Sequence, residues 1–326
     1  MTKKWKKAIA LSLAALTLTG ALAGCGDDKK AASGAAKPAA GQTIKINFPT
    51  AGASGALYAV GAAITNMWSS QVPGVQASSQ ASAGGIANLN MVSEGEAQVS
   101  IAISSNVYQC LNGTDSFKDH AYKDLKAIGG LYLNPNQVVA TANSGINSLK
   151  DVKGKHFAVA SAGSSVYNEC ETHFTAAGLS FPDDIKAEYI TFTDAADMLQ
   201  NGSIDGAWIM SGAPASAVTQ ALTGGAHLVE IDDNLIKDLK AKYPWYTSYT
   251  IKAGTYPNQD KDVKTSAIKM VMFCRGDLPE DVVYQLTKTL WEHMDELGQS
   301  QKNLKGLTAE NAVKDIADIP LHPGAA

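Results

Sequence analysis

The chain has 326 residues, and its 27 Lys and Arg against 31 Asp and Glu side chains give a formal net charge of −4 at pH 7. This balance excludes a strongly basic nucleic-acid-binding protein, so we expect no nucleic-acid partner. Hydrophobic residues make up 45% and charged residues 18% of the chain, which is too apolar for a disordered protein. The length favours two folded lobes over one.

The N-terminal segment is predicted to be an export signal. Four lysines precede an apolar run from Ala8 to Ala23 that is too short for a comfortable membrane span. The run ends in Leu22-Ala23-Gly24-Cys25, which resembles the bacterial lipobox, in which the cysteine is lipidated. We therefore expect a signal peptide over 1–24, a lipid anchor at Cys25 and a flexible linker over 25–42. The alternative is an ordinary signal peptide in which Cys25 has no role.

Strand and helix patterns alternate in the first part of the folded chain. Apolar residues alternate with polar ones over 44–48, which predicts a strand. The sequence TAGASGALY (50–58) then turns into a helix, whose buried face is marked by Leu57, Val60, Ile64 and Met67. A short strand around Val75 and a helix from Ile86 to Gly95 repeat the pattern.

The same alternation continues toward the C-terminus. We expect a strand over 157–160, a helix over 167–177, a short helix capped by Asp194 and a strand over 204–210. An apolar strand over 267–274 precedes a long helix that starts after Pro279 and points Val283, Leu286, Leu290, Met294 and Leu297 inward. The class is α/β. We place lobe 1 at 43–138 plus 253–326 and lobe 2 at 139–252, with two crossovers between them.

Loops of small residues open four of the predicted helices, at 52–55, 82–85, 161–165 and 211–214. Such loops present unbonded N–H groups and the positive end of a helix dipole, which favour an anion such as a carboxylate. For a single loop, a simple strand-to-helix turn is the better interpretation. Four of them favour a shared crevice, because these loops converge at one edge of an open sheet.

Signatures of catalysis and of metal or cofactor binding are mostly absent from the sequence. We therefore expect a non-enzymatic protein without cofactor or metal. Glu169 and His173 are spaced i, i+4, and we interpret them as a solvated helix face rather than metal ligands. Cys110, Cys170 and Cys274 fit no paired motif and are expected to be buried thiols. Arg275, the only arginine, is expected in a surface turn.

Several motifs carry a family resemblance. The chain is similar to the TAXI solute-binding proteins of tripartite ATP-independent periplasmic (TRAP) transporters. The matching pieces, spread from about Ile44 to Ala325, are TAGASGALY, Gly95-Glu96-Ala97, Leu131-Tyr132, SGINSLKDVKGK, SAGSSV, GSIDGAW, SGAP, AGTYPNQDKDVKT, LPEDVVYQLTK and PLHPGA. AGTYP together with LHPGA is the specific combination.

This resemblance implies a two-lobed periplasmic-binding-protein fold (type II-like) with hinge strands. It implies a small organic acid as ligand, such as glutamate, glutamine, a dicarboxylate or an oxo-acid. The partner would be a TRAP permease subunit, driven by an ion gradient, with the protein held at the membrane by its lipid. Together, the motifs and loops predict as ligand-binding residues Ser54, Gly55, Tyr58, Gly84, Ser105, Tyr108, Tyr132, Gly163, Ser164, Ser165 and Ala213.

The chain departs from the family pattern at acidic positions. Many relatives have Gln-Ser-Asp where this chain has Ile103-Ser104-Ser105, and a glutamate where it has Asn134. An ammonium group needs an acceptor, so we hypothesise a ligand without one. Two other classes stay open. One is a sensory or surface lipoprotein on the same fold, and the other is a hydrolase using Ser54 or Ser164 with His156 or His173.

Overall fold

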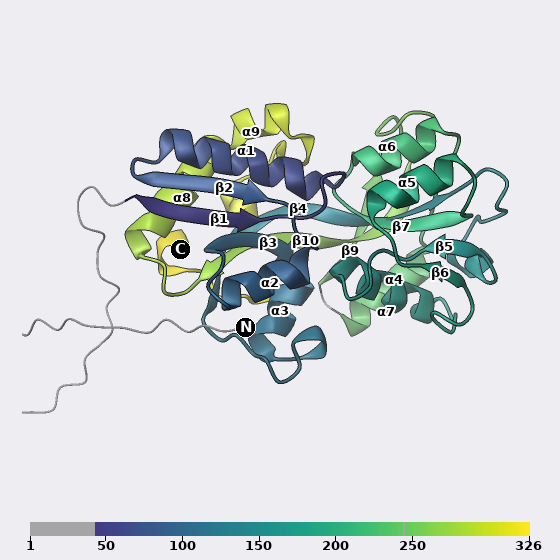
Figure 1. Cartoon of the computed structure of the whole chain (residues 1–326), viewed down its shortest axis with the longest axis horizontal. Helices are drawn as coiled ribbons and strands as arrows, with labels where there is room; N and C mark the ends of the chain where they lie inside the picture. Colours follow the sequence, from purple (N-terminus) through teal and green to yellow (C-terminus); the bar gives the residue numbers. More distant parts are fainter. Residues whose placement is uncertain (1–42, 244) are drawn as a thin grey trace, which may run out of the picture. The chain divides into compact units, whose positions relative to one another are not determined.

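The computed structural model describes residues 43–326 except residue 244. The predicted signal peptide, the linker and the lipidation site at Cys25 lie outside the described residues. By their contacts, the described residues belong to one compact unit. The α/β class is confirmed, with helices covering a central sheet (Figure 1).

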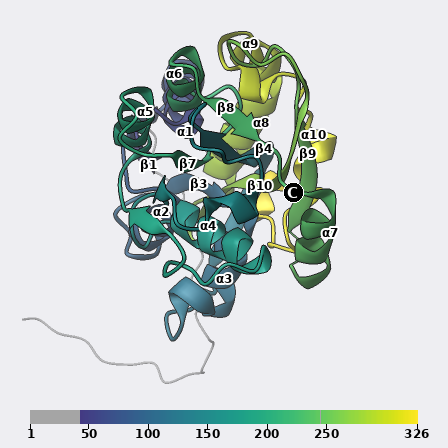
Figure 2. The ribbon, with the colours of Figure 1, turned by 90° about the vertical axis from the view of Figure 1, so that its right-hand side faces the viewer.

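Two long antiparallel strands organise the sheet. β4 (Leu125–Ala140) and β10 (Val263–Arg275) pair with each other along most of their length. The eight-stranded sheet has the order β3-β10-β4-β7-β5-β6, with β8 also paired to β4 and β9 to β10. β1 and β2 form a separate parallel pair. We call the elements around β3, β1 and β2 the first lobe, and those around β7 and β5 the second lobe. Figure 2 shows the second lobe from its outer side.

The first lobe contains, besides β4 and β10, the elements β1 (Ile44–Pro49), α1 (Ala56–Gln71), β2 (Val75–Gln80), α2 (Gly85–Ser93), β3 (Val99–Ile103), α3 (Ser104–Asn112), η1 (Asp115–Phe117), α8 (Glu280–Glu292), α9 (Met294–Ser300), η3 (Lys302–Leu304), α10 (Ala309–Ala312) and η4 (Pro323–Ala325). The second lobe contains η2 (Leu149–Val152), β5 (His156–Ala158), α4 (Ser165–Ala176), β6 (Lys186–Glu188), α5 (Phe192–Gln200), β7 (Gly206–Met210), α6 (Ser216–Thr223), β8 (His227–Val229), α7 (Asp233–Lys242) and β9 (Tyr246–Ile251).

Each lobe has a core of its own. In the first lobe, Trp68 of α1 meets Phe48 of β1 edge to face, with ring centroids 5.9 Å apart. In the second lobe, Phe174 lies 5.3 Å from Phe157 and 5.7 Å from Trp208. These five rings are all at most 1% exposed, and aromatic pairs of this geometry add to the stabilisation from apolar burial.

The predicted buried faces of the helices are confirmed. All four marked residues of α1 are buried, as are the five predicted after Pro279. The prediction of a single long helix after Pro279 is wrong. The chain forms two helices there, α8 and α9, separated at His293. The predicted lobe boundaries at 138/139 and 252/253 stay a prediction. Tyr256 and Val263, assigned to lobe 1, pack in the core cluster of α5 and α6.

The cap of α5 differs from the prediction. Thr191, not Asp194, is the N-cap residue, and its Oγ1 accepts a hydrogen bond from the Asp194 N–H at 3.2 Å. The Asp194 carboxylate in turn accepts from the Thr191 hydroxyl at 2.7 Å. Threonine is a common N-cap residue, because its hydroxyl oxygen accepts from an N–H in the first turn of the helix.

Removing this cap is expected to destabilise the protein by about 1 kcal/mol, because Thr191→Ala leaves the Asp194 N–H without its side-chain acceptor. Thr191→Ser keeps a hydroxyl at the same place and is expected to retain most of that stability. Urea unfolding of the two variants beside the unmodified chain measures the difference. Equal losses for alanine and serine would show that the methyl group, and not the cap, matters.

Candidate ligand-binding site

A cavity of about 440 Å³ lies where the four predicted loops meet. The loops at 52–55 and 82–85 come from the first lobe, and those at 161–165 and 211–214 come from the second. Every one of them contributes at least one lining residue. The expected convergence of small-residue loops on one crevice is therefore present in the structure.

Several helices begin at the cavity wall. Gly55 and Gly84 are the N-cap residues of α1 and α2, and neither helix has a side-chain cap. Ser164 caps α4, and Thr191 caps α5. All four cap residues line the cavity. The first turn of each helix leaves backbone N–H groups without carbonyl partners, and the helix dipole adds positive partial charge, so the cavity favours an anion.

The loop at 82–85 is fixed by hydrogen bonds from the buried side chain of Asn88. Asn88, which is fully buried, donates from its amide to the Thr50 carbonyl at 2.7 Å and accepts from the Ser82 hydroxyl at 2.6 Å. Gly84 has a φ of +100°, which L side chains rarely adopt. At Gly85, a Cβ atom would lie 3.0 Å from Ser165 Oγ. The two glycines thus let α2 start close to the start of α4.

Three hydrogen bonds join the first loop to the second lobe. The Ala56 N–H donates to Ser211 Oγ at 3.0 Å, and the Ser216 hydroxyl donates to the Ser54 carbonyl at 2.7 Å. The Thr193 hydroxyl bonds to Ser54 Oγ at 3.0 Å. These contacts bring the two lobes together on one side of the cavity.

Ser165 supplies an unpaired polar group at the cavity. The residue lines the cavity and is 5% exposed, and its Oγ, which lies next to Gly85, has no hydrogen-bond partner among the described residues. Buried polar atoms are nearly always paired, so an unpaired one requires a specific explanation. A ligand oxygen in the cavity would satisfy it.

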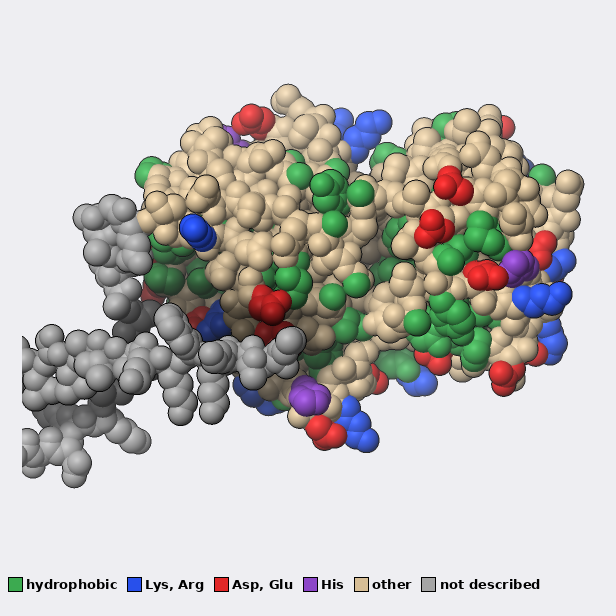
Figure 3. All heavy atoms as spheres, in the orientation of Figure 1, with side chains coloured by type: hydrophobic (Ala, Val, Ile, Leu, Met, Phe, Trp, Pro, Cys, Tyr) green, Lys and Arg blue, Asp and Glu red, His purple; other side chains and the backbone are tan. Residues whose placement is uncertain are grey.

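The rest of the lining is neutral and largely apolar. No Asp, Glu, Lys, Arg or His is among the described residues that line the cavity. Its wall is instead built by the side chains of Leu57, Ile101, Ile103, Val166, Ile190, Phe192, Met210 and Met270. Charged side chains on the outside are scattered, with no continuous field of one sign on the face in Figure 3. The cavity thus combines the N-terminal ends of helices with an apolar wall.

The structure brings five of the predicted site residues to this cavity, namely Ser54, Gly55, Gly84, Ser164 and Ser165. Gly163 and Ala213 belong to its loops but do not line it. Tyr58 lies on the exposed part of α1 at 36% exposure. Tyr132 is buried beside Gly212 and its hydroxyl has no partner among the described residues, and burial raises its pKa. Ser105 lines a different cavity. Tyr108 packs against Trp245, which also lines that second cavity.

Sequence reasoning missed part of the lining. Thr191 and Phe192, at the start of α5, line the cavity, as do Met210 and Met270 from the central strands. The Thr191-x-x-Asp194 spacing marks the helix start and was a usable signal. The methionines carry no signal, since they are indistinguishable from core residues in the sequence. Asn134, noted above where relatives have glutamate, does line the cavity.

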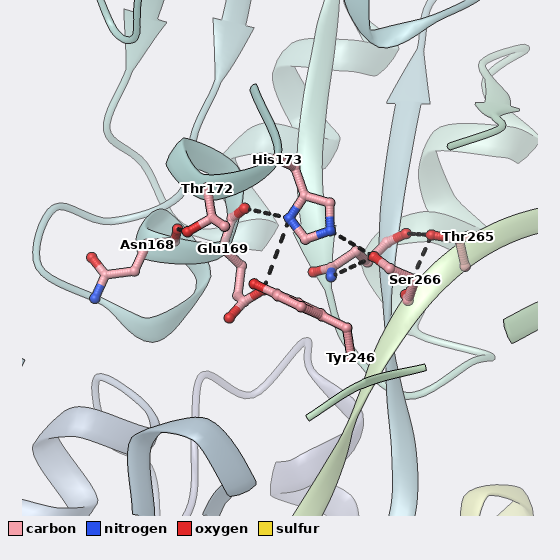
Figure 4. A network of polar contacts seen from close by, with 8 residues as sticks. Asn168, Glu169, Thr172, His173, Tyr246, Thr265 and Ser266 are labelled. Atoms are coloured by element: carbon pink, nitrogen blue, oxygen red, sulfur yellow. Dashed lines mark hydrogen bonds and ion pairs between the residues drawn. The ribbon is translucent and has the colours of Figure 1, made fainter. Parts of the chain in front are cut away.

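The interpretation of Glu169 and His173 as a solvated face is wrong. They are 5% and 0% exposed, because the side chains of Trp208 and Tyr246 pack against this face of α4. Figure 4 shows His173 between the backbone of Glu169 and Ser266. Nδ1 donates to the Glu169 carbonyl at 2.7 Å, which leaves Nε2 to accept from the Ser266 hydroxyl at 2.7 Å. Burial lowers the pKa of His173 to about 4 and raises the pKa of Glu169 to about 7.

The prediction of three buried thiols is confirmed, whereas Arg275 ends a strand and the predicted turn begins at the next residue. Cys110, Cys170 and Cys274 are free and buried, and burial raises the pKa of the Cys110 thiol to about 11. Arg275 lies at the end of β10, away from the cavity, and its guanidinium donates twice to the Asp277 carboxylate, at 2.8 and 2.5 Å. It therefore offers no clamp to a ligand.

The sequence of residues 48–326 matches the NMT1-like family. The chain belongs to that family. It is also similar to a solved structure described as a periplasmic transporter, at 17% identity and a TM-score of 0.56, covering 85% of this chain and 92% of the other. A second similar structure concerns glutathione import via GshT and the cystine ABC importer TcyBC of Streptococcus mutans. Its identity is 10% and its TM-score 0.51, covering 81% and 95% of the two chains.

The periplasmic aliphatic sulphonate binding protein SsuA from Escherichia coli matches at 19% identity and a TM-score of 0.48, covering 81% and 77%. At these identities the likeness concerns the fold. The NMT1-like chain thus has the two-lobed α/β fold of periplasmic binding proteins, as the sequence predicts, with β4 and β10 shared by the lobes. Among the described residues, no helix is both long and apolar enough to span a membrane.

Proposed function

We propose that this protein is an extracytoplasmic solute-binding protein that captures a small organic anion for uptake through a membrane permease. The cavity at the four loops carries the proposal, because helix starts and the free Ser165 hydroxyl face it without any ionic side chain in its described lining. The family and the fold support a binding role. Ligand contacts from both lobes would favour the closed arrangement over an open one, so no covalent chemistry is needed.

The geometry disfavours the hydrolase alternative. Ser164 Oγ accepts from the Tyr167 N–H at 3.1 Å, and Ser54 Oγ bonds to Thr193. Neither serine has a histidine among its hydrogen-bond partners in the described part of the chain. The pair that does meet, Ser266 and His173, is 0% exposed at both residues, so a substrate does not reach it.

The ligand class follows from what the lining provides. An ammonium group in this cavity would meet no carboxylate among the described residues, and burying it unpaired is costly. A carboxylate, in contrast, meets helix starts, and an aliphatic body meets the apolar wall. We infer a carboxylic acid without an amino group, either an oxo-acid or a dicarboxylate, in place of glutamate or glutamine.

The partner and the anchor rest on the sequence motifs. AGTYP and LHPGA support a TRAP permease as the partner, and the lipobox supports a lipid at Cys25. Labelling with radioactive palmitate in cells would test the anchor. The unmodified chain is expected to take up label, and Cys25→Ala is expected to lose it. Label on both would contradict a lipid at Cys25.

Matched ligand pairs test the ligand class directly. 2-Oxoglutarate and glutamate differ only in an oxo group against an ammonium, as do 4-methyl-2-oxopentanoate and leucine. A ligand at 100 times its Kd stabilises the folded state by about 2.7 kcal/mol, so thermal unfolding detects binding. We expect a shift with an oxo-acid and none with its amino acid. A shift with glutamate alone would keep the binding function and contradict the ligand class, and no shift with any carboxylate would contradict both.

Ser165→Ala is expected to weaken binding of the oxo-acid about fivefold, because one hydrogen bond of roughly 1 kcal/mol is lost. The free protein is expected to keep its stability, since Oγ has no partner among the described residues. Calorimetric titration measures the affinity, and Ser248→Ala, at an exposed serine of β9, is the control. Unchanged affinity in Ser165→Ala would remove this hydroxyl from the site.

A further inference from the structure

A second cavity, of about 290 Å³, lies between the lobes on the side of α3. The first lobe contributes α3 and η1, and the second contributes α4 and the start of β9. The lining residues are Ser105, Asn106, Gln109, Asp115, Ser116, Asn168, Glu169, Glu171, Thr172, Tyr243, Trp245 and Tyr246. None of them lines the first cavity, so this is a separate site.

The lining of this second cavity is acidic, whereas the lining of the first cavity carries no ionic side chain among the described residues. Asp115, Glu169 and Glu171 bring three carboxyl groups, and no Lys, Arg or His is among the described lining residues. Glu169 is the buried member, and its Oε2 accepts a hydrogen bond from the Tyr246 hydroxyl at 2.7 Å. Asp115 and Glu171 are exposed at the rim. A positively charged group is the natural complement of this arrangement.

Two buried acceptors in the same wall lack partners. Ser105 and Asn106 are 2% and 3% exposed, and neither Ser105 Oγ nor Asn106 Oδ1 has a hydrogen-bond partner among the described residues. The Asn106 amide nitrogen donates to Gln109 Oε1 at 3.0 Å, which assigns Oδ1 as the free acceptor. An occupant that donates hydrogen bonds would satisfy both atoms.

Aromatic rings form the remaining wall. Tyr243 and Trp245 are stacked, with centroids 5.4 Å apart and an interplanar angle of 27°. Trp245 and Tyr246 follow at 6.5 Å, and Tyr108 approaches Trp245 at 6.0 Å. Ring faces attract cations, most strongly at tryptophan. The Lys242 ammonium already lies over the Tyr243 ring, 5.1 Å from its centroid, so Trp245 and Tyr246 are the rings left for an occupant. A carboxylate with neighbouring aromatic faces is well suited to an organic ammonium.

We propose that this second cavity binds a small organic cation with N–H donors, with Glu169 as its main partner. A metal ion is a poorer occupant, because no group of three or more His, Cys, Asp or Glu among the described residues is arranged to hold one. A primary alkylammonium matches the three features together, since its N–H groups reach the carboxylate and the free acceptors while its chain contacts the rings.

The two cavities are neighbours along α4. Ser165 lines the first, and Glu169, four residues later on the same helix face, lines the second. An anion in the first cavity and a cation in the second would therefore attract each other. The cation site does not depend on the proposed transport function, because its residues and its probe are different.

Calorimetric titration of the purified full chain with n-butylammonium at about pH 8.5, above the pKa of about 7 that burial gives the Glu169 carboxyl, tests the proposal, with 1-butanol as the uncharged match. We expect butylammonium to bind at least tenfold more tightly than butanol. Glu169→Gln, which keeps an oxygen to accept from Tyr246, is expected to lower its affinity at least tenfold. Glu310→Gln, at an exposed acid on α10, is the control and should change nothing.

A second variant keeps the test independent of the folding of Glu169→Gln. Asp115→Asn combined with Glu171→Gln alters only exposed rim residues and is expected to weaken butylammonium binding two- to fivefold. Absence of butylammonium binding, or equal affinity for butanol, would overturn the proposal. The proposal would also be overturned if neither Glu169→Gln nor the double rim variant changed the affinity for butylammonium.

Discussion

Replacing Asn134 with glutamate is expected to weaken binding of the carboxylate ligand about 100-fold. Asn134 lies on β4, is 6% exposed and lines the neutral cavity. Two like charges roughly 5 Å apart, at an effective dielectric constant near 20, repel each other by about 3 kcal/mol, and a glutamate in the cavity wall would act on a bound carboxylate in this way. No cation among the described lining residues would offset this repulsion. Calorimetric titration with the best oxo-acid from the ligand panel measures the loss.

Asn134→Gln is the matched control, because it has the same length as glutamate without the charge. Its affinity is expected to fall less than tenfold. The glutamate variant also tests the reason for the ligand class, since the new acceptor is expected to admit the amino acid of the same pair. If Asn134→Glu and Asn134→Gln lose affinity equally, bulk and not charge controls this position, and the electrostatic argument for the ligand is wrong.

The location of the first cavity was predictable because it depends on local sequence. A loop such as 82–85 follows a strand and opens a helix, and each of these features leaves a pattern within about ten residues. The convergence of the loops then follows from the topology of α/β sheets. The apolar wall was not predictable, because Met210 and Met270 belong to strands whose apolar residues all resemble core. Only the structure shows which of them face the cavity.

The burial of Glu169 and His173 depends on residues far away in the chain. Tyr246, which bonds to Glu169, is 77 residues away, and Ser266, which bonds to His173, is 93 residues away. The i, i+4 spacing predicts only that the two side chains share a helix face. Whether that face meets solvent depends on the docking of β9 and β10 against α4, and single-sequence periodicity does not contain that information.

Single substitutions of Glu169 or His173 are expected to reveal two opposite pH dependences that cancel in the unmodified protein. The raised pKa of Glu169, about 7 against 4.5, means that its contribution to stability is largest below pH 4.5 and falls as the pH rises to 7. The lowered pKa of His173, about 4 against 6.5, makes stability rise between pH 4 and 6.5. Each shift corresponds to roughly 3 kcal/mol.

The cancellation is a matter of proton count. Between pH 4.5 and 6.5 the folded pair carries one proton, on Glu169, and the unfolded pair also carries one, on His173, so their difference is near zero. Tyr246 is the third titratable group of this network. Burial raises its pKa well above the usual tyrosine value, so it does not titrate in this window.

Urea unfolding of the variants across pH 4 to 8 checks this proton count. Glu169→Gln leaves the histidine alone, and its own stability is expected to rise by roughly 3 kcal/mol as the pH rises from 4 to 6.5, while the unmodified chain stays nearly constant between pH 4.5 and 6.5. His173→Gln leaves the carboxyl group alone and is expected to lose a similar amount between pH 4.5 and 7. The double variant should parallel the unmodified chain. If both single variants also run parallel to it, the two buried groups keep ordinary pKa values and the cancellation does not exist.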